Sequence, residues 1–199
     1  MPTTTDKTEL LARLLDALGA PGAAEVLAKR VLELALDVAG GVLGVIRLRE
    51  GHDLTARAAL GLDDEVTDRF TLPAATALAG MEPTDDAGVV FLSTDPQTAV
   101  WSKPMRDLAL RAVYALPLRP PLPNSEASNT ESLLGVIYIG APKPLVMSTE
   151  QRAFLGTIAT HACAALSKRH AIEHLEQAIR ARDDLLAVVS HDLRNPLNV

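Results

Sequence analysis

The feature that most limits the fold of this 199-residue chain is a long helical segment near its C-terminus. Between Ser148 and Pro196 the chain has no proline and a single glycine, Gly156. Ser148 suits the N-cap position, because its hydroxyl can accept a hydrogen bond from a free backbone N–H of the first turn. At 1.5 Å per residue, these about 47 residues predict a helix of roughly 70 Å.

Apolar residues in this segment form two stripes with three–four spacing. The first contains Leu155, Ile158, Ala162 and Ala165, and the second contains Ile172, Leu175, Ile179, Leu186, Val189 and Leu193. The register changes near Lys168-Arg169-His170, and two interpretations follow. Either the first stripe packs on a sheet and the second on a partner helix, or the phase break lets a rotation pass along the helix. Both require a parallel homodimer, since an isolated helix would expose its leucines.

The residues before this helix predict an α+β domain. Hydrophobic residues make up 48% of the chain but aromatic residues only 3%, so its core must be aliphatic. Two helices are expected first, over residues 8–18 and from Ala23 to Val38, and Gly40-Gly41 closes the second. The second helix should bury one side, which carries Val26, Leu27, Val31, Leu34 and Val38.

Alternating residues then predict a hairpin of two strands, Gly44 to Arg49 and Leu54 to Leu60. One face of its second strand would carry Leu54, Ala56, Ala58 and Leu60, and the opposite faces of the two strands Arg47, Arg49 and Arg57. Two later segments are apolar on both faces and predict central, covered strands. These are residues 113–118 and 133–139, and a proline-rich loop joins them. Shorter elements are expected as helices from Leu72 to Met81 and from Lys103 to Arg111, and as a strand from Gly88 to Leu92.

This order resembles a GAF domain over residues 21–168, with a PAS domain as the nearest competing class. The segments that carry the resemblance are Gly44-Val-Ile-Arg-Leu, Ala59-Leu-Gly-Leu, Ala115-Leu-Pro-Leu, Leu134-Gly-Val-Ile-Tyr-Ile and the helix from Glu150 to Leu166. The resemblance implies a GAF-like antiparallel sheet flanked by helices and a possible small-molecule pocket. An amphipathic helix (1–20) would precede this sensor domain, and a signalling helix (169–199) would follow it.

The last residues of the chain, Ser190-His-Asp-Leu-Arg-Asn-Pro-Leu197, resemble the H-box of sensor histidine kinases at every position. The resemblance implies that His191 accepts a phosphoryl group. Asp192 would act on the proton of the imidazole or hold its tautomer, and Asn195 would orient the phosphate or a water. Arg194 is a less specific charge partner. Pro196 removes a helical hydrogen bond and should bend the helix.

The chain is therefore expected to be the sensory and dimerising part of a cytoplasmic two-component histidine kinase, which passes phosphate to a response regulator. ATP and Mg²⁺ are implied for a catalytic domain past Val199, because the chain contains no glycine-rich nucleotide-binding loop. We expect these 199 residues to be inactive alone. The alternative is a GAF-like module that binds no ligand and serves dimerisation and signal coupling.

No cofactor is expected in this chain, and the GAF ligand is unknown. A bilin needs a suitably placed cysteine, and Cys163 is better explained as a small buried thiol. A haem needs an axial histidine, and His52 and His161 are better explained as ordinary surface or satisfied histidines. Trp101 and Met105 suit a pocket lining and core packing equally. Asp63-Asp64-Glu65 and Asp85-Asp86 are interpreted as loop charges or helix caps, so no metal site is expected.

Charge, cysteine content and hydropathy limit the binding partners and the cellular compartment that the sequence predicts. A net charge of −6 without a basic cluster argues against nucleic-acid binding. One cysteine cannot form an internal disulfide, which fits a reducing cytoplasm. The N-terminus lacks the layout of a signal peptide, and the most apolar region, 31–46, is too short and too charged to span a membrane.

Overall fold

The computed structural model describes residues 4–19, 22–63, 72–84, 89–94, 102–120 and 133–197. The chain divides into two compact units, Met1–Leu166 and Ser167–Val199. The described helices are α1 (Thr4–Gly19), α2 (Ala24–Ala39), the 3₁₀ turn η1 (Ala74–Thr76), α4 (Ser102–Asp107) and α5 (Thr149–Leu197). The described strands are β1 (Leu43–Glu50), β2 (Asp53–Leu60), β3 (Leu72–Pro73), β4 (Glu82–Pro83), β5 (Phe91–Ser93), β6 (Ala112–Leu118) and β7 (Gly135–Ala141).

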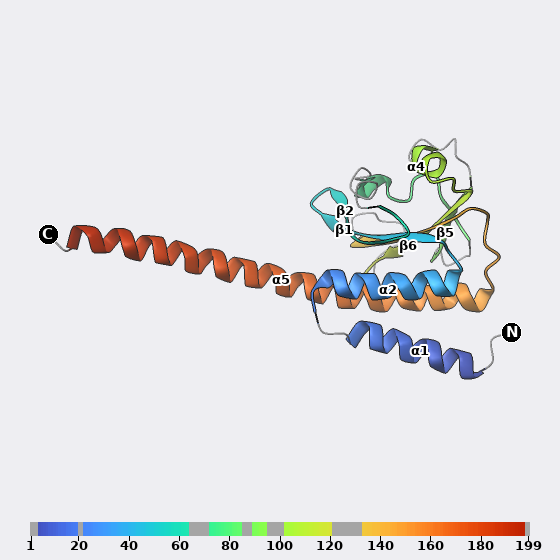
Figure 1. The fold of residues 1–199 in the computed structure, drawn as a ribbon, viewed down its shortest axis with the longest axis horizontal. Helices are drawn as coiled ribbons and strands as arrows, with labels where there is room; N and C mark the ends of the chain where they lie inside the picture. The colour runs from blue at the N-terminus through green and yellow to red at the C-terminus, as the bar shows by residue number, and fades with distance from the viewer. Residues whose placement is uncertain are drawn as a thin grey trace. The chain divides into compact units, whose positions relative to one another are not determined.

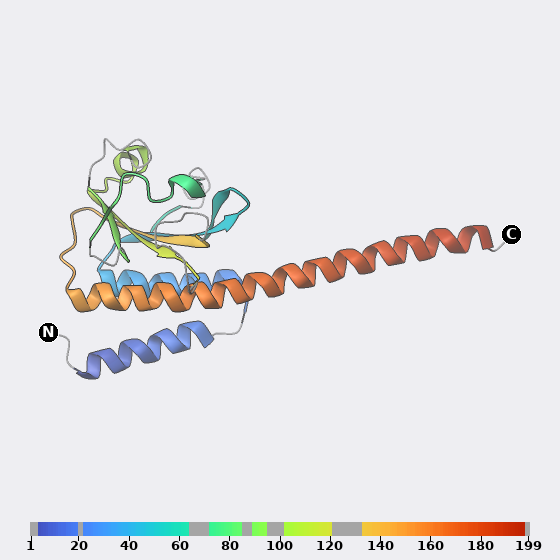
Figure 2. The same ribbon diagram turned by 180° about the vertical axis from the view of Figure 1, so that it is seen from behind.

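The first unit is built on one antiparallel sheet, as predicted. Its seven described strands lie in the order β3-β2-β1-β7-β6-β5-β4. In Figures 1 and 2, α2 and the first turns of α5 run along one face of the sheet, and α4 lies over the other. The central strands β6 and β7 are buried on both faces, which confirms the expectation from their continuous apolar sequences.

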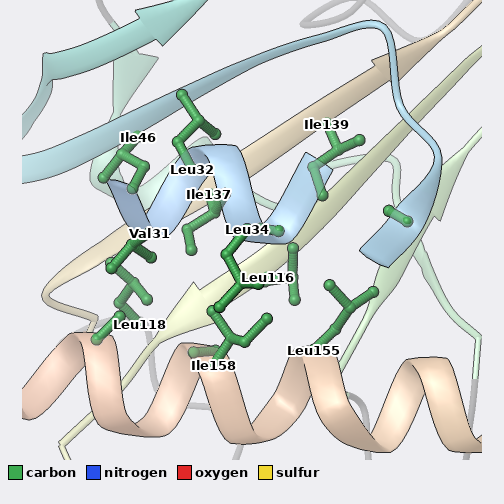
Figure 3. Packing of buried hydrophobic residues seen from close by; sticks show 14 of the residues in the cluster. Val31, Leu32, Leu34, Ile46, Leu116, Leu118, Ile137, Ile139, Leu155 and Ile158 are labelled. Carbon is green, nitrogen blue, oxygen red and sulfur yellow. The ribbon is translucent and has the colours of Figure 1, made fainter. Parts of the chain in front are cut away.

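The main core lies between the sheet and the two long helices (Figure 3). Its largest fully buried side chains are Leu27 and Leu32 of α2, Ile46 of β1, Leu116 and Leu118 of β6, Ile137 and Ile139 of β7, and Leu155 and Ile158 of α5. Each such side chain contributes about 1.5–3 kcal/mol by leaving water. The first stripe of the long helix therefore packs on the sheet, in agreement with the simpler of the two interpretations.

The predicted buried side of α2 is correct except at its first member. Leu27, Val31, Leu34 and Val38 are buried, whereas Val26 is 44% exposed. Val26 falls outside the arc of the helix that the sheet covers. Gly40 ends α2 with φ 73°, and its N–H bonds to the carbonyl of Leu36, as expected for a left-handed C-cap.

A reciprocal cap starts α5. The Ser148 hydroxyl accepts from the Gln151 N–H at 3.1 Å, and the Gln151 Oε1 accepts from the Ser148 N–H at 2.9 Å. This capping box confirms Ser148 as the N-cap and stabilises the helix by about 1 kcal/mol. The Gln151 Nε2 also donates to the carbonyl of Val38 at 3.0 Å, so the start of α5 is bonded to the end of α2.

Gly156 explains how closely α5 approaches the chain at Val89. A Cβ atom at position 156 would lie 2.6 Å from a methyl carbon of Val89, which is closer than real contacts allow. Glycine is therefore required here for close packing, although it weakens the helix by about 1 kcal/mol relative to alanine.

The hairpin β1–β2 differs from its prediction, because a β-bulge interrupts it. The register shifts between Ile46 and Arg47 of β1, which leaves Arg57 of β2 as the extra residue. An extra residue reverses the alternation of a strand. Leu54 and Ala56 consequently lie with one cluster, whereas Ala58 and Leu60 lie with the main core on the other face.

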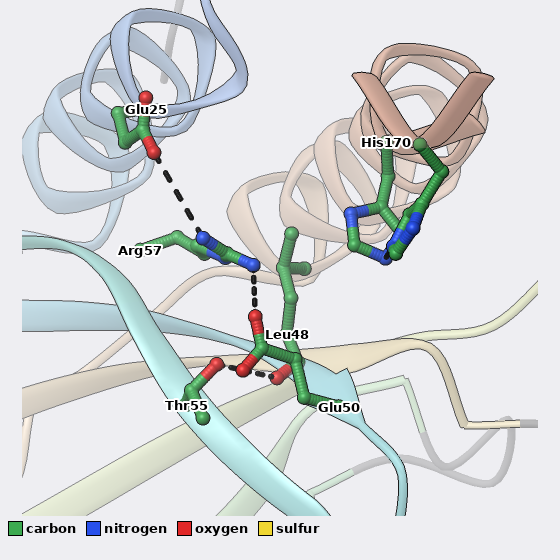
Figure 4. A network of polar contacts seen from close by, with 7 residues as sticks. Glu25, Leu48, Glu50, Thr55, Arg57 and His170 are labelled. Carbon is green, nitrogen blue, oxygen red and sulfur yellow. Dashed lines mark hydrogen bonds and ion pairs between the residues drawn. The ribbon is translucent and has the colours of Figure 1, made fainter. Parts of the chain in front are cut away.

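The bulge residue Arg57 joins the hairpin to α2. Its guanidinium contacts the carboxylate of Glu50 at the end of β1 and lies 3.8 Å from that of Glu25 (Figure 4). The same close-up shows the Thr55 hydroxyl donating to the carbonyl of Leu48 at 3.4 Å. These partly exposed ion pairs each contribute little stability, and they connect the bulge to the end of β1 and to α2.

Two predicted helices are shorter than expected. The segment from Leu72 to Met81 forms the two-residue β3, the turn η1 and a further turn, because Leu72 and Pro73 pair with β2. The helix predicted from Lys103 to Arg111 ends at Asp107. Its end carries the bonds of a Schellman motif, from the Leu110 N–H to the Met105 carbonyl and from the Ala109 N–H to the Arg106 carbonyl.

The described part of the second unit is the remainder of α5. Its predicted second stripe is exposed in the single chain, with Ile172 at 43%, Leu175 at 63% and Ile179 at 51%. Within the described ranges, no helix combines the length and the apolarity that crossing a bilayer demands.

Ala109→Gly is expected to stabilise the protein. Ala109 has φ 52°, the only positive value among the described non-glycine residues, and its Cβ makes that conformation costly. Glycine should raise the free energy of unfolding by about 0.5–1 kcal/mol, as measured by urea denaturation. The control Ala153→Gly, at an exposed helical position of α5, should lower it by about 1 kcal/mol. Destabilisation by both substitutions would contradict the left-handed conformation of residue 109.

Candidate functional site

The predicted phosphoacceptor segment lies at the end of α5. The backbone is helical through Leu197, so His191, Asp192 and Asn195 belong to a continuous stretch of helix. The side chains of these three residues lie outside the described residues. Their assignment therefore stays a prediction from the sequence, as does the bend at Pro196.

A second candidate site is the sheet face that α4 covers, opposite α2 and α5. A second cluster of buried side chains gathers there, and its members come from β1, β2, η1, α4, β6 and β7. The apolar members with the largest side chains are Val45, Leu54, Met81, Met105, Leu110, Val113, Leu133 and Val136. The short elements η1 and α4 contribute to this cluster, so we call this side of the sheet the loop-side face.

Arg47 brings a positive charge to the loop-side face. It lies opposite Val136 of β7 in the sheet register, and paired residues share a face. Its side chain is only 4% exposed, and one guanidinium nitrogen donates to the carbonyl of Leu54 at 3.4 Å. The sequence predicted that Arg47 lies on the face of the hairpin opposite the buried one, whereas the structure buries Arg47 as well. Burial of a guanidinium is costly unless it is paired. Arg47 gives this face a buried positive charge, in contrast to the mainly aliphatic core on the other face of the sheet.

Tyr138 places a hydroxyl on the same face. It lies opposite Val45 and Ala115, and its hydroxyl donates to the carbonyl of Ala77 at 2.8 Å. Burial raises the pKa of Tyr138 far above its ordinary value, and the positive charge of Arg47 partly opposes that rise. The phenol is therefore a neutral hydrogen-bond donor that ties β7 to the segment after η1.

Ser93 adds a second hydroxyl. It lies opposite Val113, which belongs to the loop-side cluster, and it is 2% exposed. Its Oγ has no hydrogen-bond partner among the described residues. A buried hydroxyl of this kind costs about 1–3 kcal/mol unless a partner satisfies it.

Together these groups give the loop-side face one buried cation and two buried hydroxyls in an apolar setting. Such a combination suits recognition of a small polar or anionic molecule, in which few polar groups fix the orientation of the ligand. Tyr138 and Ser93 were not among the candidate residues predicted from the sequence. A usable signal was a tyrosine inside a strand that is otherwise aliphatic, because a buried phenol needs a partner for its hydroxyl.

Of the described residues that the sequence offered for a ligand, Cys163, His52 and His161 lie outside the loop-side cluster. Cys163 is buried in the main core, as predicted for a structural thiol, and His52 and His161 are exposed. Met105 is buried in the loop-side cluster, whereas Trp101 lies outside the described residues. Of the acidic loop residues, Asp63 is described, and Asp64, Glu65, Asp85 and Asp86 lie outside.

A groove of about 700 Å³ lies elsewhere, between α1 and α2. Its lining includes Glu9, Ala12, Arg13, Asp16, Ala17, Arg30, Glu33 and Leu34. Ion pairs cross between these helices, from Arg13 to Asp37 at 2.6 Å and from Arg30 to Asp16 at 3.6 Å. The ion pairs join α1 to α2. The groove is open and is lined by residues of both charges, so it does not favour a ligand of one charge.

The fold is that of a GAF domain, as comparison with solved structures establishes. The GAF domain of an Acinetobacter phosphoenolpyruvate-protein phosphotransferase matches with a TM-score of 0.63 and 14% identity, over 85% of this chain and 98% of that domain. A bacteriophytochrome from the photosynthetic bacterium R. palustris matches with a TM-score of 0.62 and 13% identity, over 91% of this chain and 41% of that protein. No protein-family model and no curated protein matches the chain. At these identities the likeness concerns the fold.

The two tyrosines should resist ionisation while the protein is folded. Burial raises the pKa of both Tyr114 and Tyr138. Above pH about 10, the unfolded chain loses phenolic protons that the native chain keeps, so stability should fall as pH rises past that value. Absorbance at 295 nm should show tyrosinate only together with unfolding. Tyr138→Phe should cost about 1 kcal/mol at pH 7, by leaving the Ala77 carbonyl without its donor, and should make the alkaline loss shallower. Tyrosinate formation near pH 10 in the folded protein would contradict this.

Proposed function

We propose that this chain is the sensory and dimerising part of a two-component histidine kinase. The GAF-like domain would control ATP-dependent phosphorylation of His191 and transfer of the phosphoryl group to a response regulator. The observation that carries the proposal is the complete H-box match from Ser190 to Leu197 in a helix that begins on a GAF-like domain. The motif is supported by its position, because a sensor domain followed by a long helix is the arrangement in which such a histidine can be regulated.

In the proposed reaction, a neutral imidazole nitrogen of His191 attacks the γ-phosphorus of ATP in line. A nitrogen–phosphorus bond forms, the bond from the γ-phosphorus to the bridging oxygen breaks, and ADP leaves. Asp192 holds the imidazole tautomer or takes the proton of the other ring nitrogen. Asn195 follows one helical turn later, within reach of the phosphoryl group or of a water. ATP and Mg²⁺ would be held by a catalytic domain outside these 199 residues.

The exposed stripe of the second unit supports a parallel dimer. Counted as a heptad with Ile172 at position a, the stripe places Leu175 at d, Ile179 and Leu186 at a, and Val189 at d. The described members are exposed in the single chain, and a second copy would cover them. In this register His191 takes position f, on the outside of a two-stranded coiled coil, where a catalytic domain has access.

A second candidate function is coupling without a ligand. The observation in its favour is that the described part of the loop-side face is filled by its own side chains, with Met81 and Met105 among them. Native mass spectrometry of the purified chain separates the two functions. A bound metabolite that is lost in Arg47→Met favours sensing, and a ligand-free dimer favours coupling.

Substitution of His191 tests the kinase assignment. Labelled ATP alone should leave the chain unlabelled, whereas addition of a histidine-kinase ATP-binding domain should give an acid-labile, base-stable label. His191→Gln should abolish that label, because it removes the attacking nitrogen. His161→Gln, elsewhere on α5, should retain it. Label that survives in His191→Gln would refute the assignment of the phosphoacceptor.

Charge placed in the stripe should dissociate the dimer. The double variant Leu175→Glu with Leu186→Glu puts like charges on both helices at the seam, where burial is costly. Sedimentation equilibrium should give a dimer for the wild-type chain and a monomer for the variant. Gln177→Glu introduces the same residue at the outer position f and should leave the dimer intact. A dimer that persists in the double variant would place the contact elsewhere.

A further inference from the structure

A pair of histidines lies one helical turn apart near the beginning of the second unit. His170 and His174 are four residues apart on α5, and their Nε2 atoms are 3.0 Å from each other (Figure 4). Their rings meet edge to face, with centroids 4.3 Å apart and planes at 88°. Neither ring is buried, so ions in solution can reach both nitrogens.

The separation of the two nitrogens fits a shared metal ion. Transition metals bind imidazole nitrogen at about 2.0–2.1 Å, so two neighbouring ligands of one ion are about 2.9–3.4 Å apart, for angles from a right angle to tetrahedral. Without a metal, the same approach is a hydrogen bond in which one neutral ring donates to the other. A divalent cation can replace that proton with little movement of either side chain.

We propose that His170 and His174 form a two-ligand site for a divalent transition metal of the Zn²⁺, Cu²⁺ or Ni²⁺ class. Both rings supply neutral Nε2 atoms, and water completes the coordination. Glu173, between them in the sequence, adds negative charge to the same turn. The described residues contain no group of three or more histidine, cysteine or acidic side chains arranged to hold a metal. The proposed metal ion bridges two side chains one helical turn apart and can exchange with ions in solution, unlike a metal in a closed structural centre with four protein ligands.

The site is complete within one chain. In the register counted from Ile172, His170 takes position f and His174 position c, both on the outside of a two-stranded coiled coil. A dimer would carry two separate sites, one on each helix, and would not block either. This inference does not depend on phosphorylation at His191, because it uses different residues and a different chemistry.

The test is metal titration of the untagged 199-residue chain at pH 7.5. Isothermal titration with ZnCl₂ should show one ion per chain, and Cu²⁺ should give an electron paramagnetic resonance spectrum with nitrogen coupling. His174→Gln and His170→Gln should each weaken binding at least about tenfold, because one of two ligands is lost. His161→Gln on the same helix should bind as the wild type does. Amide hydrogen exchange around residues 170–174 should slow with Zn²⁺ in the wild type and in His161→Gln, and should stay unchanged in His170→Gln and His174→Gln.

Spacing variants distinguish a ligand pair from an indirect effect on folding. In the His174→Gln background, Glu173→His restores two imidazoles at a spacing of three residues, which also share a helix face, and should recover Zn²⁺ binding. Ala171→His in the same background places them on different faces and should not. Wild-type affinity in His174→Gln, loss of binding in His161→Gln, or one ion per two chains would each overturn the proposal.

Discussion

The first unit depends on the burial of one sheet face beneath α2 and the first turns of α5. Strands β6 and β7 are buried on both sides, so without these helices one complete face of the sheet would lie in water. The contact is mostly aliphatic, because the core on this face consists mainly of leucine, isoleucine, valine and alanine. This packing uses glycine at two positions, Gly156 in α5 and the left-handed Gly40 after α2.

Most of the fold could be predicted, because it follows from long periodic patterns. The leading helices, the two central strands and the start of α5 each have an apolar spacing typical of one kind of secondary structure. Glycine or serine caps mark where the helices begin or end. The errors fall where the tertiary context overrides a short pattern. An extra residue at Arg57 reverses a strand without any sign in the composition, and the segment after Leu72 pairs with β2 although its alanines favour a helix.

Less of the candidate site could be predicted, for two different reasons. Arg47 was expected on the face of the hairpin opposite the buried one, because a single strand does not reveal that both of its faces are covered. That Arg47, Ser93 and Tyr138 share one face of the sheet follows only from the pairing of four strands. The spacing of His170 and His174 is visible in the sequence, but the approach of their nitrogens requires the geometry. The roles of His191 and its neighbours rest on the motif alone.

The side chain of Gln151 has a consequence for the evolution of this domain. Its carbonyl oxygen completes the cap of α5, and its amide nitrogen bonds to the last turn of α2. Glutamate could perform the first task but has no proton for the second, and lysine could perform the second but not the first. One position, far from any proposed chemistry, thus needs both halves of an amide. Among descendants of this chain, residue 151 should accept far fewer kinds of amino acid than the neighbouring exposed positions of the same turn.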